Sequence, residues 1–476
     1  MAYIVGIDRN QTRMITTSLD ALIDEDNSVR VIDAYVDSLD LIELGFKEYN
    51  GTNRGQAPYR RADLLKLHIY GYLNKIRSSR SLEIECKRNL ELMWLINAIT
   101  PDHGTISGFV KNNRDAFHAT LRNLTLILKG WGLIDGNLIA IDGTKIRAQN
   151  SNHNCLTKSG LDKKIAYADE QINAYLMAIE KDSKSEPEFK KKLEDYQELK
   201  KQYLQQKLEL TDQGLEQKSL TDPDSRRMKN NGSLDICYNV QSVVDAQNHF
   251  VIDISTTNDI NDQNQLYVMA KDATDLLEST ECTVIADTGY YNASEIKNCV
   301  DDGMTVLIKK AKANNSTKDN EFRKDRFKYD VDKDIYICPA GQQLEFFENT
   351  SKNGMKYRKY KCSSCSNCKY RENCTSSQNG RTLQRWEHEA VLEKVHEITY
   401  SNNDTYKQRR CIVEHPFGTV KRSLGYSFFL RKKTENVDAE ASSMFIAYNF
   451  KRLLTMFSTR ELIEKFSEKR KRYAAV

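Results

Sequence analysis

The sequence predicts a mixed α/β fold that is divided into more than one domain. At 476 residues the chain is long enough for two or three domains. Short apolar runs that end in an acidic residue alternate with stretches whose apolar residues recur every three or four positions. The first pattern is typical of buried strands, and the second is typical of amphipathic helices. Hydrophobic residues make up 39% of the chain, which is enough for real cores in a polar protein.

Composition also excludes some classes of protein. No apolar run reaches the roughly 18 residues that a membrane-spanning helix needs. The first residues lack the basic start and apolar core of a secretory signal, so we expect a cytoplasmic protein with no membrane partner. The formal net charge is only +4, but basic residues cluster at 226–229, 323–328, 431–433 and 469–472. One such cluster is usually a solvated face, whereas several on one surface would favour a polyanion such as DNA.

Residues 1–133 are predicted to form a helical domain. From Pro58 onward apolar residues recur at helical spacing, and residues 100–104 interrupt that pattern. A helix, a short turn and a second helix in a region with several arginines suit a DNA-binding module. The alternative is an ordinary helical bundle that only packs.

Two predicted strands each end in a carboxylate. Residues 138–141 form an apolar run that is followed by Asp142, and residues 282–286 form a second run that is followed by Asp287. A third acid, Glu414, lies in a later helical stretch that also holds basic residues. Three acids on separate elements, with basic residues nearby, suggest metal-dependent chemistry on phosphates.

The order of the remaining predicted elements in residues 134–455 indicates a particular fold. A charged helical hairpin is expected as an insertion at about 155–230, and it is followed by a β-hairpin, a helix, the strand before Asp287, a helix and a further strand. Three antiparallel strands followed by alternating helices and parallel strands are the order of a ribonuclease-H-like fold. In that fold, acids on the first strand, the fourth strand and the last helix converge.

Cleavage of a phosphodiester requires an activated water or hydroxyl and neutralisation of charge on the phosphate, which two divalent ions can provide. We expect Asp142 to bridge two Mg²⁺ or Mn²⁺ ions, with Asp287 and Glu414 each holding one. Taken singly, an acid at a strand end is more often a helix cap or an ion-pair partner.

Four basic residues near these acids are predicted to contact DNA phosphates. Arg410 and Lys421 lie four residues before and seven residues after Glu414, so both can lie close to its helical face. Lys145 and Arg147 follow Asp142 directly and are candidates for the same role. The alternative for the helical pair is an exposed salt bridge, which contributes little to stability.

Five of the eleven cysteines crowd into residues 338–374. Closely paired cysteines with one distant partner suit a tetrahedral structural Zn²⁺ site, and four ligands complete it. We assign Cys338, Cys365, Cys368 and Cys374 as ligands and leave Cys362 out. This zinc-knuckle-like insertion is expected at about 311–405, with an iron–sulfur cluster as the minor alternative. Residues 456–476 are predicted to be a basic C-terminal tail.

Four motifs, taken together and in this order, resemble the DDE transposases of bacterial insertion sequences, with the eleven-eighty-two group as the nearest branch. The motifs are Leu67–Arg80, Ile141–Ala148, Ala286–Asn292 and Glu414–Lys421. Related transposases carry a tyrosine, arginine, glutamate and lysine signature in the last helix. Arg410, Glu414 and Lys421 match that signature, while Lys407 occupies the tyrosine position and Tyr406 lies one place off.

The resemblance implies a DNA transposase of the bacterial nucleoid with a ribonuclease-H-like core. It implies that the protein binds terminal inverted repeats, cleaves DNA at the ends of the element with magnesium, and transfers the freed 3′-hydroxyl to target DNA. Joining two ends implies a homodimer on double-stranded DNA. Two alternatives stay open. A ribonuclease-H-like nuclease or resolvase would cleave without strand transfer, and a transposase-derived DNA-binding protein would be expected to have lost at least one acid.

Overall fold

The structure is a computed structural model, and it describes residues 16–47, 57–181, 186–279, 281–310 and 320–474. Parts of the predicted N-terminal domain, of the cysteine-containing insertion and of the C-terminal segment lie outside these ranges. The fold is mixed α/β, as predicted. No helix among the described residues is both long and apolar enough to span a membrane.

The chain divides into two compact units. The first unit comprises Met1–Asp135, Gly143–Ile260 and Ile412–Val476, and the second comprises Gly136–Asp142 and Asn261–Cys411. These boundaries differ from the predicted domain limits because strand β1 (Leu138–Arg147) and helix α13 (Asn403–Gly418) each contribute to both units. The predicted division at residues 133 and 455 therefore stays a prediction.

The first unit is mainly helical. Its N-terminal helices are α1 (Val29–Asp37), α2 (Arg61–Leu73), α3 (Ser79–Glu85), α4 (Leu90–Leu95), α5 (His103–Asn112) and α6 (Arg114–Gly130). Helix α14 (Thr434–Met456) packs on α2, α6 and strand β6 (Val251–Thr257), and nearly every side chain from Val437 to Phe450 is buried. A helix that is buried on all sides is the centre of a core, so α14 organises the packing of this unit.

The segment predicted as a basic tail contains a helix, α15 (Thr459–Ala474). Leu462 and Phe466 are spaced four residues apart and are fully buried. The Phe466 ring lies 5.3 Å from the Tyr35 ring and 4.9 Å from the Trp131 ring, measured between centroids. These apolar side chains pack the helix against α1. The many charged residues of the segment had hidden this helix from the sequence-based prediction.

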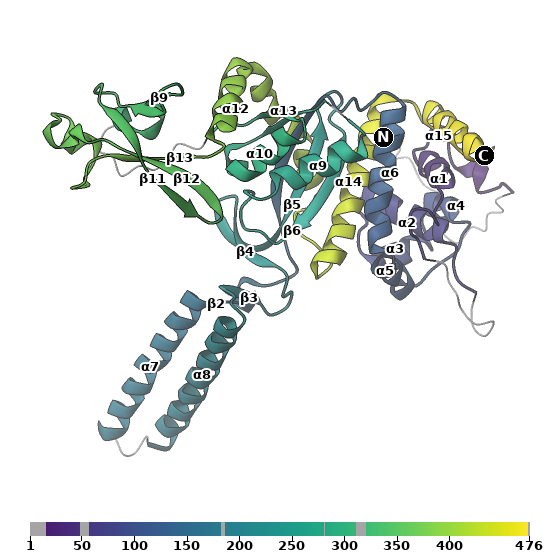
Figure 1. The fold of residues 1–476 in the computed structure, drawn as a ribbon. Coiled ribbons are helices and arrows are strands. Elements are labelled where there is room, and N and C mark those ends of the chain that lie inside the picture. Colours follow the sequence, from purple (N-terminus) through teal and green to yellow (C-terminus); the bar gives the residue numbers. More distant parts are fainter. Residues whose placement is uncertain (1–15, 48–56, 182–185, 280, 311–319, 475–476) are drawn as a thin grey trace, which may run out of the picture. The chain divides into compact units, whose positions relative to one another are not determined.

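The predicted helical hairpin is present and lies in the first unit. Helices α7 (Lys158–Lys181) and α8 (Glu186–Asp212) run side by side, and strands β2 (Cys155–Thr157) and β3 (Gln217–Ser219) pair at its base (Figure 1). Rings of Tyr175 and Tyr196 stack between the two helices with centroids 5.8 Å apart.

A six-stranded sheet contains the segments that carry the predicted aspartates. Its strand order is β4-β5-β1-β7-β8, with β6 also paired to β5. Strand pairs β4–β5 and β5–β6 are antiparallel, whereas β1–β7 and β7–β8 are parallel. The strands are β1 (Leu138–Arg147), β4 (Arg226–Asn230), β5 (Ser233–Asp245), β6 (Val251–Thr257), β7 (Thr283–Ala286) and β8 (Thr305–Leu307). This arrangement has the predicted antiparallel hairpin and the predicted parallel strands.

The second unit covers its parallel strands with helices and adds a second sheet. The helices are α9 (Leu266–Leu276), α10 (Ala293–Asp301), the short α11 (Arg371–Cys374) and α12 (Glu389–Ser401), followed by most of α13 (Asn403–Gly418). The second sheet has the order β13-β12-β11-β10-β9. Its strands are β9 (Lys328–Asp330), β10 (Ile335–Ile337), β11 (Gln343–Lys352), β12 (Met355–Lys361) and β13 (Thr382–Trp386).

Candidate active site

Asp142 and Asp287 lie at the same edge of the six-stranded sheet. Strands β1 and β7 pair in parallel register, with Ile141 opposite Ala286, so the two aspartates occupy the next position on adjacent strands. Both are partly buried, while the apolar residues before them are fully buried. Asp287 directly follows the end of β7, whereas Asp142 lies within β1, which continues to Arg147, so the prediction that a strand ends at Asp142 is wrong. The paired register nevertheless places the two carboxylates on neighbouring strands.

The backbone after β7 fixes the carboxylate of Asp287. Its Oδ1 accepts a hydrogen bond of 2.7 Å from the backbone N–H of Gly289, and this bond caps the short turn Thr288–Tyr290. A Cβ at position 289 would lie 2.9 Å from the same oxygen. Glycine therefore lets the turn approach the carboxylate, and Asp287 caps the turn through one of its two oxygens.

An arginine that the sequence reasoning did not select contacts Asp142. The Arg409 Nη1 lies 3.3 Å from Asp142 Oδ2, and both side chains are partly buried, with 19% and 24% of their surface exposed. Arg410, the predicted phosphate contact, is exposed. Successive helical residues differ in direction by about 100°, so neighbouring arginines on α13 face different surroundings.

A signal for Arg409 was present in the sequence. Tyr406 and Arg409 have the tyrosine–arginine spacing of the signature described above, shifted by one residue relative to Glu414. Burial raises the pKa of Tyr406, and the charge of Arg409 lowers it while that of Asp287 raises it. The Lys309 ammonium lies 4.7 Å from the Tyr406 ring centroid. The side of α13 that carries Tyr406 and Arg409 thus faces the aspartates of the second unit.

Tyr290 is a further residue of this site that the sequence reasoning missed. Its side chain is fully buried. Burial raises its pKa well above the ordinary value, and the negative charges of Asp262, Asp142 and Asp287 raise it further. The phenol therefore stays protonated beside a concentration of negative charge, which is the electrostatic character expected of a site for cations.

The third predicted acid and three of the four predicted DNA contacts belong to the first unit. Glu414 is exposed on α13, and Arg147 is exposed at the end of β1. Lys421 lies in a π-helical turn, Thr419–Ser423, and its Nζ donates a 2.7 Å hydrogen bond to the backbone carbonyl of Lys145. Burial lowers the pKa of Lys421, and the charge of Lys145 lowers it further. The structure thus brings Lys145 and Lys421 together.

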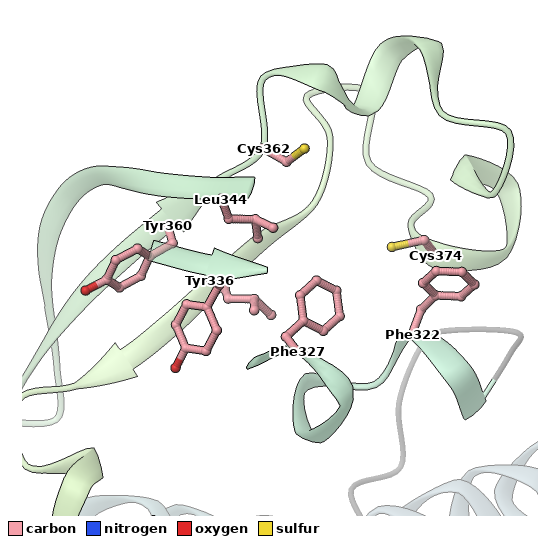
Figure 2. Close-up of a cluster of buried hydrophobic side chains, with 8 residues drawn as sticks. Phe322, Phe327, Tyr336, Leu344, Tyr360, Cys362 and Cys374 are labelled. Atoms are coloured by element: carbon pink, nitrogen blue, oxygen red, sulfur yellow. The ribbon is translucent and has the colours of Figure 1, made fainter. Parts of the chain in front are cut away.

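The five clustered cysteines line one small cavity of about 20 Å³ in the second unit. The sulfur atoms of Cys362 and Cys374 point toward the space between them, beside buried aromatic and aliphatic side chains (Figure 2). The backbone N–H of Gln342 donates to Cys338 Sγ at 3.2 Å, and that of Arg381 donates to Cys365 Sγ at 3.5 Å.

The thiols also influence one another. Burial raises the pKa of Cys362 to about 11, with further contributions from Cys365 and Cys338. Burial likewise raises the pKa of Cys374, and its neighbours Cys365, Cys338 and Cys368 add to the shift. A cluster of thiols whose ionisation is mutually unfavourable is the chemistry that a soft divalent ion relieves.

The atoms available as ligands at the two predicted metal sites are of the types that the predicted metals prefer. Carboxylate oxygens at the sheet edge suit Mg²⁺, and clustered sulfurs suit Zn²⁺. Within the ranges that the structure describes, no three His, Cys, Asp or Glu side chains are already arranged to hold a metal ion.

Comparisons with known proteins give two matches to family models. Residues 17–112 match a model described as a transposase domain (DUF772), and residues 337–454 match a model described as a transposase DDE domain. A search of curated proteins gives no match.

Among solved structures, the chain is similar to the cryo-EM structure of a piggyBac transposase synaptic complex with hairpin DNA. The similarity covers 95% of this chain and 82% of that chain, at 9% identity and a TM-score of 0.30.

Proposed function

We propose that this chain, an insertion-sequence-type DDE transposase by its two domain matches, cuts DNA at the ends of its element and joins the 3′-ends to a target. The observation that carries the proposal is the pair of carboxylates on adjacent parallel strands. Asp142 and Asp287 follow paired residues in register, beside a buried tyrosine and an arginine.

Asp142, Asp287 and Glu414 are the residues that would hold two divalent ions, Mg²⁺ or Mn²⁺. Bound there, such ions supply charge neutralisation at the phosphate and activation of the attacking water or 3′-hydroxyl. The ribonuclease-H-like assignment is supported by the strand order, by the parallel pairing of β1, β7 and β8, and by the place of both aspartates.

The chain's own residues prepare this site. The N–H of Gly289 holds one oxygen of Asp287 and leaves the other for a ligand. Arg409 neutralises part of the charge of the Asp142 carboxylate. Lys145 and Lys421 form a basic pair that suits a phosphate, and Arg147 and Arg410 are exposed cations suited to the same ligand.

We further propose that Cys338, Cys365, Cys368 and Cys374 hold a structural Zn²⁺ in a zinc-knuckle-like insertion. The common cavity and the two N–H···S hydrogen bonds support this assignment, because hydrogen bonds to metal-ligating side chains orient those ligands. The zinc would stabilise a segment whose core is small. Two copies of the chain are proposed to bind the two ends of the element as a homodimer on double-stranded DNA.

Cleavage of a supercoiled plasmid that carries the gene's own flanking DNA tests the function. With magnesium, wild type is expected to cut at the ends and to yield joined products, whereas Asp142→Ala yields neither. Cutting at random positions without joining would instead indicate a ribonuclease-H-like nuclease. Binding to the flanks without any cutting would indicate a transposase-derived DNA-binding protein.

A further inference from the structure

A large cleft opens in the first unit, and its lining includes none of the three acids assigned to catalysis. Its volume is about 1100 Å³, and it is lined by residues around α3, by α5 and by the segment that leads into α14. Seven basic residues line it against two acidic ones. The basic residues are Arg77, Arg80, Lys111, Arg114 and residues 431–433. Segments that are far apart in the sequence therefore concentrate positive charge around one hollow.

The two acids of the cleft are already engaged. Glu435 forms an ion pair with Arg114, and Asp224 Oδ2 accepts a 3.0 Å hydrogen bond from the backbone N–H of Thr434. Arg80, Lys111 and both lysines at 432–433 are exposed. The charge available to a ligand is consequently positive.

The segment that carries residues 431–433 is held by buried carboxylates. Glu440 of α14 is fully buried, and its carboxylate accepts hydrogen bonds of 2.9–3.1 Å from the backbone N–H groups of Leu430 and Arg431. Asp222 Oδ1 accepts a 3.0 Å bond from the N–H of Lys433. Because the backbone is fixed at both ends of the basic run, the cations are presented before any ligand arrives.

Arg77 and Arg431 join the walls of the cleft. The Arg77 guanidinium lies 4.8 Å from the ring centroids of both Tyr426 and Phe428, and it donates to the Phe428 carbonyl at 2.7 Å. Arg431 Nη1 lies 3.4 Å from the carbonyl of Ser107 on α5. These two arginines have structural partners, so Arg80, Lys111, Lys432 and Lys433 are the residues to test for binding.

The lining of the cleft favours a phosphodiester backbone over stacked bases. Gly104, Ser107 and Gly108 give α5 a face of small side chains, and a Cβ at Gly108 would meet no atom within 4 Å. Tyr72 is the one Phe, Tyr or Trp among the described residues that line the cleft, and its side chain is buried. Single-strand binders place exposed aromatic rings under the bases, whereas duplex backbones need distributed cations.

We propose that this cleft binds the phosphate backbone of double-stranded DNA and that Arg80, Lys111, Lys432 and Lys433 supply sequence-independent contacts. The inference rests on the proposed function, because it assigns the surface by which the transposase holds its DNA substrate. It combines the predicted N-terminal DNA-binding region with a basic cluster that lies more than 300 residues later in the chain.

The test compares two quadruple variants of the full chain. The cleft variant is R80Q/K111Q/K432Q/K433Q, and the control K47Q/K87Q/K201Q/R460Q removes the same charge from exposed positions of the first unit outside the cleft. Circular dichroism and thermal unfolding verify that both fold. Fluorescence anisotropy then measures binding to a duplex with the element's end and to an unrelated duplex, without divalent metal, between about 50 and 200 mM salt.

The cleft variant is expected to bind both duplexes roughly 10²- to 10³-fold more weakly at about 100 mM salt, and its salt slope should fall by roughly 3 to 4. The control should stay within about threefold of wild type. Equal losses in both variants would overturn the inference, since only total charge would then matter. A loss confined to the end duplex would also overturn it, because base contacts would be responsible.

The failure of this inference is distinguishable from failure of the proposed function. If the cleft variant binds and cuts end DNA as wild type does, the cleft is not the DNA surface and the transposase assignment stands. If wild type itself neither binds nor cuts its end DNA, both proposals fail. If wild type binds an acidic polypeptide in place of DNA and the cleft variant loses that binding, the surface belongs to a protein partner and the inference is overturned.

Discussion

The two units of the molecule treat charge in opposite ways. The second unit concentrates two carboxylates at the edge of a buried sheet, where backbone register places them. The first unit spreads exposed cations from distant segments around a cleft. Its buried carboxylate Asp253 is paired with His118 and Arg122. A reaction needs a few groups in fixed positions, whereas affinity for a polyanion needs many cations in approximate positions. The difference predicts that a single substitution at one of the carboxylates abolishes catalysis, whereas a single substitution at one of the cleft cations only weakens DNA binding by a small amount.

The largest expected effect is on catalysis, at the sheet edge. Asp287→Asn removes a charged ligand but keeps the hydrogen bond to Gly289, so we expect cleavage at the element's ends to fall by at least roughly 10³-fold. Binding of end DNA should change by less than about threefold. Single-turnover cleavage and anisotropy on the same preparations measure both quantities. Asp332→Asn, an exposed turn residue of the same unit, is the matched control, and an equal loss there would contradict the assignment.

The cysteine cluster tests whether the second unit also depends on a metal for its structure. Cys368→Ser is expected to reduce bound zinc from about one ion per chain to nearly none and to destabilise the insertion, because structural zinc contributes directly to folding. Elemental analysis of purified protein, with limited proteolysis, measures this change. Cys362→Ser should keep its zinc. Wild type without zinc would show that the cavity is only a thiol-lined core, and equal zinc loss in both variants would contradict the choice of ligands that leaves Cys362 out.

The first unit contains a buried ion network whose removal should cost an intermediate amount of stability. His118 on α6 lies 2.8 Å from Asp253 Oδ1 and 2.9 Å from Asp438 Oδ2, and Arg122 also bonds Asp253. Burial opposes the charged imidazolium, but the two aspartates outweigh it and raise the pKa of His118 to about 10. His118→Gln should lower the free energy of unfolding by about 2–4 kcal/mol at neutral pH.

The pH dependence of that effect follows from the sign of the shift. Because the folded pKa of His118 is raised, its contribution is complete below the ordinary value near 6.5 and is lost as the pH rises through about 10. Denaturant unfolding of wild type and His118→Gln should therefore converge at high pH. His153→Gln, at an exposed position, is the control. A difference that grows with pH would refute the charged state of His118.

The smallest expected effect is at Arg409. Its ion pair neutralises part of the Asp142 charge, so Arg409→Gln should lower the half-saturating Mg²⁺ or Mn²⁺ concentration by about three- to tenfold. Calorimetric titration of the DNA-free protein with Mn²⁺ measures this without relying on activity. Arg410→Gln, the neighbouring exposed arginine, should leave metal binding unchanged. Weaker metal binding in Arg409→Gln would mean that the arginine holds Asp142 in position for the metal.

Local sequence patterns predicted most elements of the catalytic sheet. The apolar runs before Asp142 and Asp287 form β1 and β7, and the predicted hairpin and helical insertion are present. The match is good because buried strands and long helices depend on the period of their own residues. The C-terminal segment was less predictable, since Leu462 and Phe466 gain meaning only when α1 is there to cover them.

The amino-acid sequence alone was enough to predict the class of fold, the apolar runs before the two aspartates and the crowding of cysteines, because each depends on residues that are adjacent in the chain. It did not show that β1 continues past Asp142 to Arg147. Only the tertiary structure decided that Arg409 rather than Arg410 contacts Asp142, that Tyr290 lies beside the acids, and that residues 431–433 share a cleft with α5. These relations join residues more than 100 positions apart, or depend on which side of a helix faces a neighbour. The packing of the folded chain sets both, and no local pattern encodes them.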